Sequence, residues 1–201
     1  MSITNDASSA VPQWRTHIAQ ALAQSQDKPE ARYLQFATTD EQGCPSVRTV
    51  VFRGFVPDND KFIVHTDCRS EKIRHLNHFN NVQLCWYFAL TREQFRVTGH
   101  IDVIDNLHKQ GSQLRSEQWQ GISSAAKASY AGKTPGALMP LDDIHQATVE
   151  EDSDLESVND NFVVLLLTPT RVEHLQLTTT PHTRNLYRFE QGTWLQDRIN
   201  P

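Results

Sequence analysis

Two neighbouring segments of the sequence carry arginine, hydroxyl and lysine side chains, the residue types that bind phosphate. The first is PSVRTVVFRGF, residues 45–55, whose β-branched and aromatic residues predict a strand. It contains Arg48 and Arg53. Side chains alternate along a strand, so a separation of five predicts opposite faces unless a bulge intervenes. Because burying an unpaired charge is very costly, each arginine must find an anion, pair with a carboxylate or lie at an edge.

The second segment is HTDCRSEK, residues 65–72, in which Thr66, Ser70 and Lys72 surround the start of a helix predicted over 70–79. We expect Ser70 to be the N-cap of this helix. Hydroxyls, free backbone N–H groups, the positive end of the helix dipole and a fixed charge together suit a phosphate. Taken alone, the segment fits a capped surface helix with solvated charges at least as well.

Three further residues are weaker candidates for a site. Gln94 lies in a strand-like run, and an amide both donates to and accepts from the polar edge of a heterocycle. His182 and Arg184 occupy alternate positions of one extended segment. Both could contact an anion or a substrate, or the segment could be a surface turn without a ligand. His75 and His78 could face one side of a helix, but no further ligand at a zinc-like spacing follows, so we expect no metal site.

The elements that must position these residues are mostly strands. Strand patterns at short spacing cover 32–40, 45–55, 61–67, 81–90 and 92–104, and others cover 161–170, 172–177 and 185–201. Helical spacing covers 11–26, 70–79 and 106–131. The pattern predicts a mainly β (α+β) fold, an antiparallel sheet curled into a barrel with several flanking helices. We expect residues 1–10 to be mobile and 132–158 to form a long loop.

Composition limits the function classes. The chain has 201 residues and a net charge of -5, which predicts one domain over 1–201 and argues against a nucleic-acid partner. No apolar run is long enough to span a membrane. Three cysteines without a CxxC spacing predict reduced thiols, and with no signal peptide evident we expect a cytoplasmic protein.

Taken in order, the segments resemble the pyridoxamine 5'-phosphate oxidase family of flavin mononucleotide (FMN) binding split barrels. The matching segments are RTVVFRGF, HTDCRSEK, REQFRVTGHI, VEHLQL, PHTR and the final WLQDRINP. The sequences of the segments RTVVFRGF, CWYF and TREQFR are most similar to those of a divergent branch, the Alr4036-type FMN-binding domain proteins. The resemblance covers about residues 30–104 and 161–201. It implies an antiparallel split β-barrel and a homodimer with FMN at the subunit interface.

The resemblance also implies a set of FMN-binding residues. They are Arg48, Thr49, Val50, Val51, Arg53, His65, Thr66, Ser70, Lys72, Gln94 and Arg184. Thr66, Ser70 and Lys72 would hold the phosphate end, and Gln94 would come from the partner subunit. His182 is the candidate catalytic residue, as a substrate contact or proton relay.

Several positions depart from the family pattern. Glu71 stands where the family has arginine, His65 where it has tyrosine and Leu175 where it has tryptophan. Thr180 replaces the arginine that would contact substrate. Residues 106–160 cannot be matched one by one.

These departures leave several hypotheses open. The first is an FMN-dependent oxidoreductase carrying out two-electron chemistry on a small molecule. Others are pyridoxamine or pyridoxine 5'-phosphate oxidation proper, which Thr180 argues against, and a carrier or sensor of FMN without turnover. A barrel that binds no flavin at all would gain support from Glu71.

Overall fold

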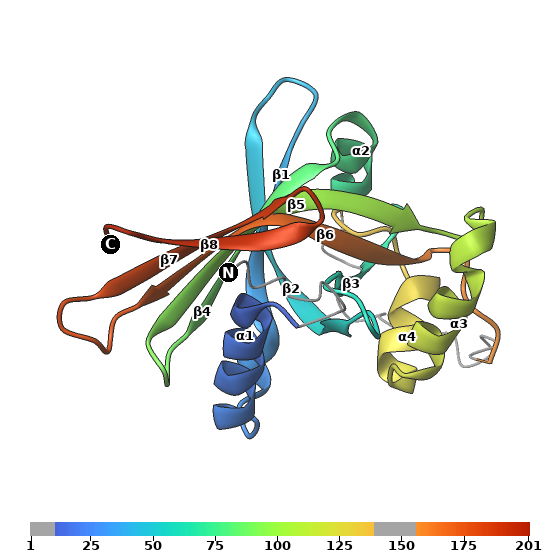
Figure 1. The fold of residues 1–201 in the computed structure, drawn as a ribbon. Helices are drawn as coiled ribbons and strands as arrows, with labels where there is room; N and C mark the ends of the chain where they lie inside the picture. Colours follow the sequence, from blue (N-terminus) through green and yellow to red (C-terminus); the bar gives the residue numbers. More distant parts are fainter. Residues whose placement is uncertain (1–10, 139–155) are drawn as a thin grey trace.

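The computed structural model describes residues 11–138 and 156–201, which form one antiparallel sheet and several helices (Figure 1). The strands are β1 Tyr33–Thr39, β2 Pro45–Phe55, β3 Phe62–Asp67, β4 Asn81–Phe88, β5 Glu93–Ile104, β6 Phe162–Gln176, β7 Thr183–Glu190 and β8 Thr193–Ile199. The α-helices are α1 Gln13–Gln24, α2 Glu71–His78, α3 Ser112–Gln120 and α4 Ser124–Ala131, and the 3₁₀ turns are Pro29–Arg32 and Lys109–Gly111. The segment 1–10, predicted to be mobile, and most of the predicted loop 132–158 lie outside the described residues.

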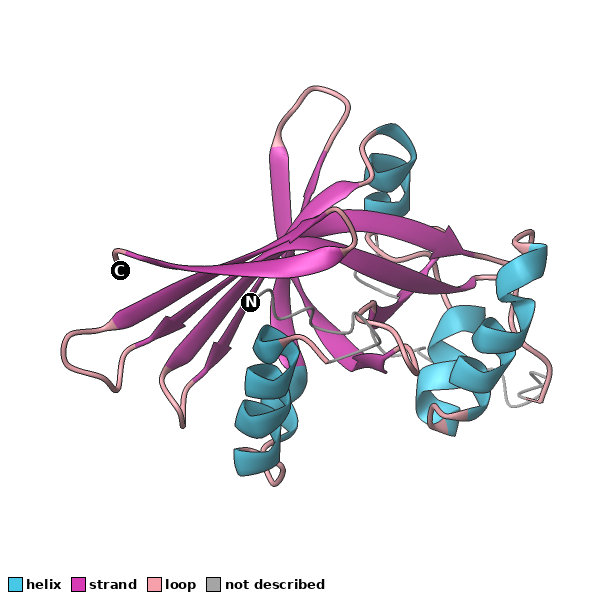
Figure 2. Cartoon of the chain, in the orientation of Figure 1, coloured by secondary structure: helices cyan, strands magenta, loops and turns pink. Residues whose placement is uncertain are grey.

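The sheet closes into a barrel. Its strand order is β3-β2-β1-β4-β5-β6-β7-β8, and β3 also pairs with β6, so the strands from β3 round to β6 form a closed ring. The first half of β6 pairs with β3, and residues 171–176 pair with β7. Strands β7 and β8 therefore extend beyond the barrel as an arm, which projects on the left in Figure 2. The predicted antiparallel barrel with flanking helices is confirmed.

Alternating side chains fill the barrel. On β1, Leu34 and Phe36 point inward and are almost fully buried, while Tyr33 and Gln35 are exposed. Helix α1 covers the barrel through Trp14, whose ring stacks on that of Phe62 with centroids 5.7 Å apart. Burying a large aromatic side chain of this kind stabilises a fold by about 2 to 3 kcal/mol, so α1 is held to the barrel by packing.

Strand β2 changes neighbours part-way along its length. Residues 45–51 pair with β1, whereas pairing with β3 involves only Phe52, Gly54 and Phe55, with a register shift between Phe52 and Gly54. The bulge lies at Arg53 itself, and burial alternates regularly from Arg48 to Arg53, so the two arginines face opposite sides of the strand as predicted. Along 45–51 the edge of β2 that faces away from β1 has no strand partner in the described chain. This is where the barrel is split.

A second apolar cluster lies outside the barrel, where α3 and α4 cover β3 and β6. It contains Ile63, Ile104, Trp119, Phe162, Val164 and Leu166. The helical pattern predicted over 106–131 is confirmed in type but is broken into α3 and α4 at Gly121–Ser123. Arg115 in α3 is buried and donates to the carbonyl oxygens of Phe162 and Asn159, which ties the helix to the start of β6.

Two strand patterns of the sequence, 161–170 and 172–177, belong to one long strand, β6. Pro169 has no N–H to donate, and it lies opposite Gly99 at the register shift between Thr98 and Gly99. The closing hairpin β7–β8 forms as predicted, with its turn at Gln191 and Gly192. Cys44, Cys68 and Cys85 are free thiols. No helix within the two described stretches is long and apolar enough to cross a membrane.

We predict that Gly99→Ala destabilises the fold, because a Cβ at Gly99 would lie 2.1 Å from the backbone carbonyl oxygen of Thr168. The expected loss in the free energy of unfolding is about 2 kcal/mol or more, since backbone cannot yield as a flexible side chain does. Urea denaturation measures it. The control is Gly121→Ala, where the nearest atom lies at 3.7 Å. Equal stability of both variants would contradict this account of the β5–β6 contact.

Candidate functional site

Arg48 lies on the inward face of β2 at the open end of the barrel, and three neighbours fix its guanidinium group. Nη1 donates to the Thr38 hydroxyl at 2.6 Å and to the Phe36 carbonyl oxygen at 3.3 Å, and Nη2 donates to the Ser46 hydroxyl at 2.7 Å. A guanidinium group has five N–H donors. The Nε–H and one Nη2–H are left without a partner among the described residues, so Arg48 presents two directed donors to a ligand.

Lys72 brings a second cation to the same end of the barrel. Its Nζ donates to the hydroxyl oxygens of Thr66 at 2.8 Å and Ser70 at 2.6 Å. Each hydroxyl accepts from Lys72, so its own O–H remains available as a donor. Thr66 is the inward residue next to the end of β3, and Ser70 directly precedes α2, so the chain turning from strand into helix brings the three side chains together.

Arg48 and Lys72 interact electrostatically. Burial and the nearby charge of Arg48 lower the pKa of Lys72 to about 8, and Glu71 acts in the opposite direction. Burial lowers the pKa of Arg48, again opposed by Glu71. A guanidinium group stays charged at ordinary pH, so two cations lie close together, and the carboxylates of Asp67 and Glu71 offset them only in part. A bound anion would relieve this repulsion.

We call Arg48, Thr66, Ser70 and Lys72 the anion cradle. Its free donors are two N–H groups of Arg48, one of Lys72 and the two hydroxyls. Charge-assisted hydrogen bonds from arginine and lysine are the strong ones, and a phosphate offers oxygen acceptors to all of them. The structure brings Thr66, Ser70 and Lys72 together and adds Arg48, which the resemblance assigns to the flavin and not to its phosphate.

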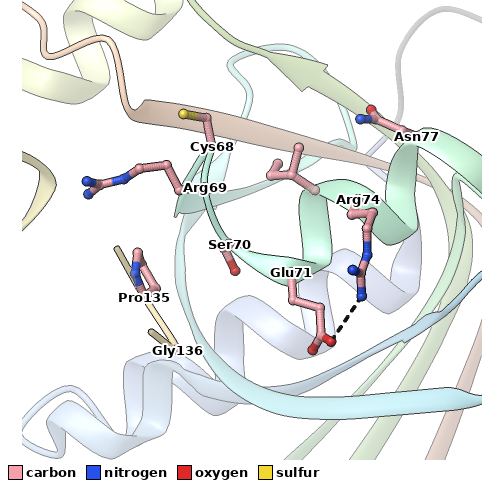
Figure 3. A pocket seen from close by; sticks show the side chains of 9 residues that line it. Cys68, Arg69, Ser70, Glu71, Arg74, Asn77, Pro135 and Gly136 are labelled. Atoms are coloured by element: carbon pink, nitrogen blue, oxygen red, sulfur yellow. Dashed lines mark hydrogen bonds and ion pairs between the residues drawn. The ribbon is translucent and has the colours of Figure 1, made fainter. Parts of the chain in front are cut away.

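Ser70 differs from its predicted role as a helix cap. It occupies the N-cap position of α2, but its side chain makes no capping hydrogen bond, because the hydroxyl accepts from Lys72 instead. Glu71 is exposed and pairs with Arg74 at 3.4 Å (Figure 3). Both carboxylate and guanidinium face an open cavity of about 540 Å³ between the start of α2 and Pro135–Gly136. The cavity adjoins the anion cradle at Ser70 and Glu71.

Arg53 and His65 lie apart from the anion cradle, on the face of the sheet toward α3. They share a shallow pocket of about 330 Å³ with Arg32 and Gln118. Burial lowers the pKa of His65 to about 4, although a hydrogen bond between Nε2 and the Gln118 side-chain oxygen at 2.9 Å opposes the shift. The ring is therefore neutral at ordinary pH. Arg53 is exposed, with no hydrogen bond or ion pair to any residue that the structure describes.

The remaining flavin candidates on β2 divide between two faces. The side chain of Val50 is buried in the barrel core, with 8% exposure, so only its backbone can contact a ligand. Thr49 is exposed and Val51 half-buried on the opposite, outer face. The backbone edge of 45–51 is open on the side away from β1, which leaves main-chain N–H and C=O groups accessible beside Arg48.

Gln94 and Arg184 lie in one row on the outer face of the sheet. Gln94 pairs with Leu175, and Leu175 pairs with Arg184 on the next strand. From β2 to β5 the sheet spans three strand spacings, about 14 Å, so one chain does not bring this row to the anion cradle. The structure thus separates Gln94 and Arg184 from the other candidates.

Arg184 is held by a buried carboxylate that the sequence did not single out. Glu173 accepts from Arg184 and from Arg171, the latter at 2.9 Å, and Arg96 lies 3.6 Å away. Burial opposes ionisation, but the hydrogen bonds from Arg184 and Arg171 prevail and lower the pKa of Glu173. Three arginines share one carboxylate, so this part of the outer face carries net positive charge.

His182 lies in the exposed segment before β7. Its Nδ1 is 3.0 Å from the carbonyl oxygen of Thr179, which can only accept, so Nδ1 carries the proton. Thr180 is exposed as well. Neither residue is near the anion cradle through any contact in the described chain, and the catalytic role of His182 stays a prediction. Within the same ranges, no three His, Cys, Asp or Glu side chains are grouped to hold a metal ion.

Comparisons with known proteins agree with this geometry. The family model described as pyridoxamine 5'-phosphate oxidase, FMN-binding domain, matches residues 11–105. A protein of Arabidopsis thaliana, pyridoxine/pyridoxamine 5'-phosphate oxidase 2, is 34% identical over 199 residues, 95% of this chain and 98% of that protein.

Two solved structures share the fold. A pyridoxamine 5'-phosphate oxidase-related, FMN binding protein from Nostoc punctiforme PCC 73102 is 36% identical, with a TM-score of 0.89 over 98% of this chain and 100% of that chain. PhzG from Burkholderia lata 383, in complex with tetrahydrophenazine-1-carboxylic acid, is 20% identical, with a TM-score of 0.77 over 100% and 98% of the two chains. The second likeness shows the fold alone.

The buried charge of Lys72 generates a prediction about stability and pH. Its pKa is about 8 in the folded protein and 10.5 for an ordinary exposed lysine, so the unfolded chain holds more protons between these pH values. The penalty for folding with a charged Lys72 is therefore full below pH 8 and fades as pH rises. Relative to Lys72→Met, the wild type should gain stability between pH 8 and 10, by at most about 1 kcal/mol per pH unit after solvent screening.

Urea midpoints of the ligand-free proteins at pH 7, 8, 9 and 10 measure this difference. Lys28→Met, at an exposed lysine, is the matched control and should show no such trend against wild type. If the gap between wild type and Lys72→Met stays constant across the series, Lys72 does not titrate in the way its surroundings indicate.

Proposed function

The chain belongs to the pyridoxamine 5'-phosphate oxidase family, and from that premise we propose that it binds FMN and acts as an FMN-dependent oxidoreductase on a small molecule. The observation that carries the proposal is the anion cradle. Arg48, Thr66, Ser70 and Lys72 converge from β2, β3 and the start of α2 with their remaining donors unused. The phosphate of FMN supplies the acceptors that this arrangement lacks.

The rest of the cofactor would lie along the split in the barrel. Thr49, the backbone of Val50 and Val51 border the open edge of β2 and would line the flavin. When bound, FMN supplies two-electron redox chemistry, and the protein orients and tunes it. Arg53 is a permanent cation free to stabilise negative charge, but unlike lysine it cannot exchange a proton at ordinary pH.

Two alternatives differ in what the bound FMN does. Oxidation of pyridoxamine or pyridoxine 5'-phosphate is favoured by the name of the Arabidopsis thaliana relative. It is disfavoured by Thr180, an exposed neutral side chain where the resemblance leads us to expect an arginine for the substrate. A carrier or sensor of FMN without turnover is favoured by the same loss at Thr180, because the flavin-type residues Arg48, Ser70 and Lys72 are nonetheless retained.

We also propose a homodimer that completes the site. The outer face of the sheet exposes large apolar side chains, namely Val47, Tyr33, Tyr87 and Leu195. Patches of this kind mark interaction surfaces when they are contiguous and rimmed by polar groups. Pairing two outer faces would bring Gln94 and Arg184 of one subunit toward the flavin of the other, which one chain cannot do.

We predict that the wild-type protein binds FMN and that Arg48→Ala weakens this binding by about tenfold or more, because two charge-assisted hydrogen bonds to phosphate are lost. Quenching of flavin fluorescence on titration measures the affinity. Arg188→Ala, which removes an arginine paired with Asp197 and Glu190 on the arm, is the control and should bind FMN like wild type. A wild-type protein that cannot be loaded with FMN refutes the proposed function.

Turnover of the FMN-loaded protein separates the alternatives. Peroxide release on addition of pyridoxamine 5'-phosphate would establish the oxidase. Bleaching of the flavin by NADH or NADPH would support a reductase with another electron acceptor. Stable binding without either response would favour the carrier.

The dimer is tested by changing its exposed apolar side chains. Tyr87→Lys places a charge on the outer face, where Tyr87 is 47% exposed, and should shift the protein from dimer to monomer and lower FMN affinity severalfold. Leu107→Lys, at a 79% exposed leucine in a turn, should change neither property. Light scattering after gel filtration gives the mass. A monomeric wild type with full FMN affinity would be inconsistent with a shared site.

A further inference from the structure

His75 is a buried histidine that none of the site arguments above uses. It lies in α2 with 2% exposure, directly behind the anion cradle. Its Nδ1 is 2.9 Å from the Thr38 hydroxyl oxygen, and the same hydroxyl oxygen accepts from Arg48 Nη1 at 2.6 Å. A hydrogen-bonded row therefore runs from α2, through β1, to the arginine of the anion cradle on β2.

The protons of this row can be assigned from donor chemistry. A guanidinium group only donates, so the Thr38 oxygen accepts from Arg48. The hydroxyl then has one proton to give, and the Nδ1 of a neutral imidazole is the acceptor beside it. In the tautomer that accepts from Thr38, His75 carries its proton on Nε2. That N–H is buried and has no hydrogen-bond partner in the described chain, with the nearest carboxylate oxygen, of Glu71, 3.9 Å away.

We propose that His75 is a positioning residue for the FMN phosphate, holding Arg48 in its binding orientation by fixing the Thr38 hydroxyl. The inference rests on the proposed function, because it concerns how Arg48 of that same site is oriented before the phosphate binds. A threonine hydroxyl rotates freely unless its proton is engaged, and an unengaged hydroxyl could point that proton at Arg48. By accepting the proton, His75 keeps the hydroxyl oxygen turned toward the guanidinium group.

The surroundings explain why Arg48 needs this support. Along 45–51 the strand has a partner on one side only, so the arginine stands at an open edge. Its other side-chain partner, Ser46, lies on the same strand and moves with it. Thr38 on β1 and His75 on α2 are the contacts that relate Arg48 to the helix carrying Lys72. The row thereby sets the distance between the two cations of the anion cradle.

Three variants test the proposal. His75→Leu removes the acceptor at similar size, and His75→Asn restores an acceptor at the position of Nδ1. Thr38→Val removes the hydroxyl with little change of shape. Each purified full-length variant is titrated with FMN and with riboflavin, which has the same ring and chain but no phosphate. The melting temperature is recorded alongside.

We expect His75→Leu and Thr38→Val each to weaken FMN binding by about tenfold and riboflavin binding by less than about twofold. His75→Asn should stay within about threefold of wild type for both ligands. Because the two residues act in one row, the double variant His75→Leu/Thr38→Val should be no weaker than either single variant. If His75→Leu fails to fold, the FMN and riboflavin affinities of Thr38→Val decide the question.

The outcomes separate this inference from the proposed function. FMN affinity unchanged in both His75→Leu and Thr38→Val overturns the inference alone. Equal losses for FMN and riboflavin overturn it as well, since they show a structural role without regard to phosphate. A wild type that binds no FMN overturns the proposed function and the inference together.

Discussion

The change of partner along β2 is the constraint on which the site depends. A strand whose residues 45–51 pair on one side and whose residues 52–55 pair on the other cannot close the barrel by itself. Closure is left to β3 and β6, and the gap beside β2 stays open. In a regular barrel the backbone N–H and C=O groups on this edge of β2 would pair with a neighbouring strand. Here they remain available, and the Arg48 side chain lies beside them. The bulge at Arg53 and the split are two aspects of one departure from regular pairing.

Charge in the anion cradle is finely balanced. Arg48 and Lys72 contribute two positive charges, while the exposed carboxylate of Glu71 acts on both of them in the opposite sense. A cradle of this kind is less positive than the same cradle would be with an arginine in place of Glu71. Its attraction for an anion is correspondingly weaker. The open cavity of about 540 Å³ lies beside it at Ser70 and Glu71.

Much of the fold could be predicted from sequence because its signals are local. Alternation and turn residues located 45–55 and the closing hairpin well, since strands and tight turns are encoded within a few residues. The clustering of Thr66, Ser70 and Lys72 was also predictable, because the three residues lie within seven positions of each other. The Alr4036-type assignment stays a prediction.

The partners of these residues were not predictable. Thr38 meets Arg48 because of the β1–β2 register, and Glu173 meets Arg184 because of the β6–β7 register. Registers are set by the whole sheet, and no local pattern reports them. Ser70 occupies the predicted N-cap position, but the partner of its hydroxyl was not predictable, because Lys72 meets it beside Thr66 of β3. The role of His182 could not be judged from spacing alone.

Strand β6 has a consequence for how the molecule opens. Its first part closes the barrel against β3, and its last part carries the arm of β7 and β8, with Pro169 and the shift at Gly99 between them. The proline interrupts the hydrogen-bond ladder at that boundary. Tyr187 is buried in the barrel core and the Trp194 ring lies 5.3 Å from that of Trp14, so we expect fraying only at the end of the arm where Arg184 pairs with Ile199. If the arm supplies Arg184 to a neighbouring subunit, such fraying would expose the flavin without unfolding its phosphate site.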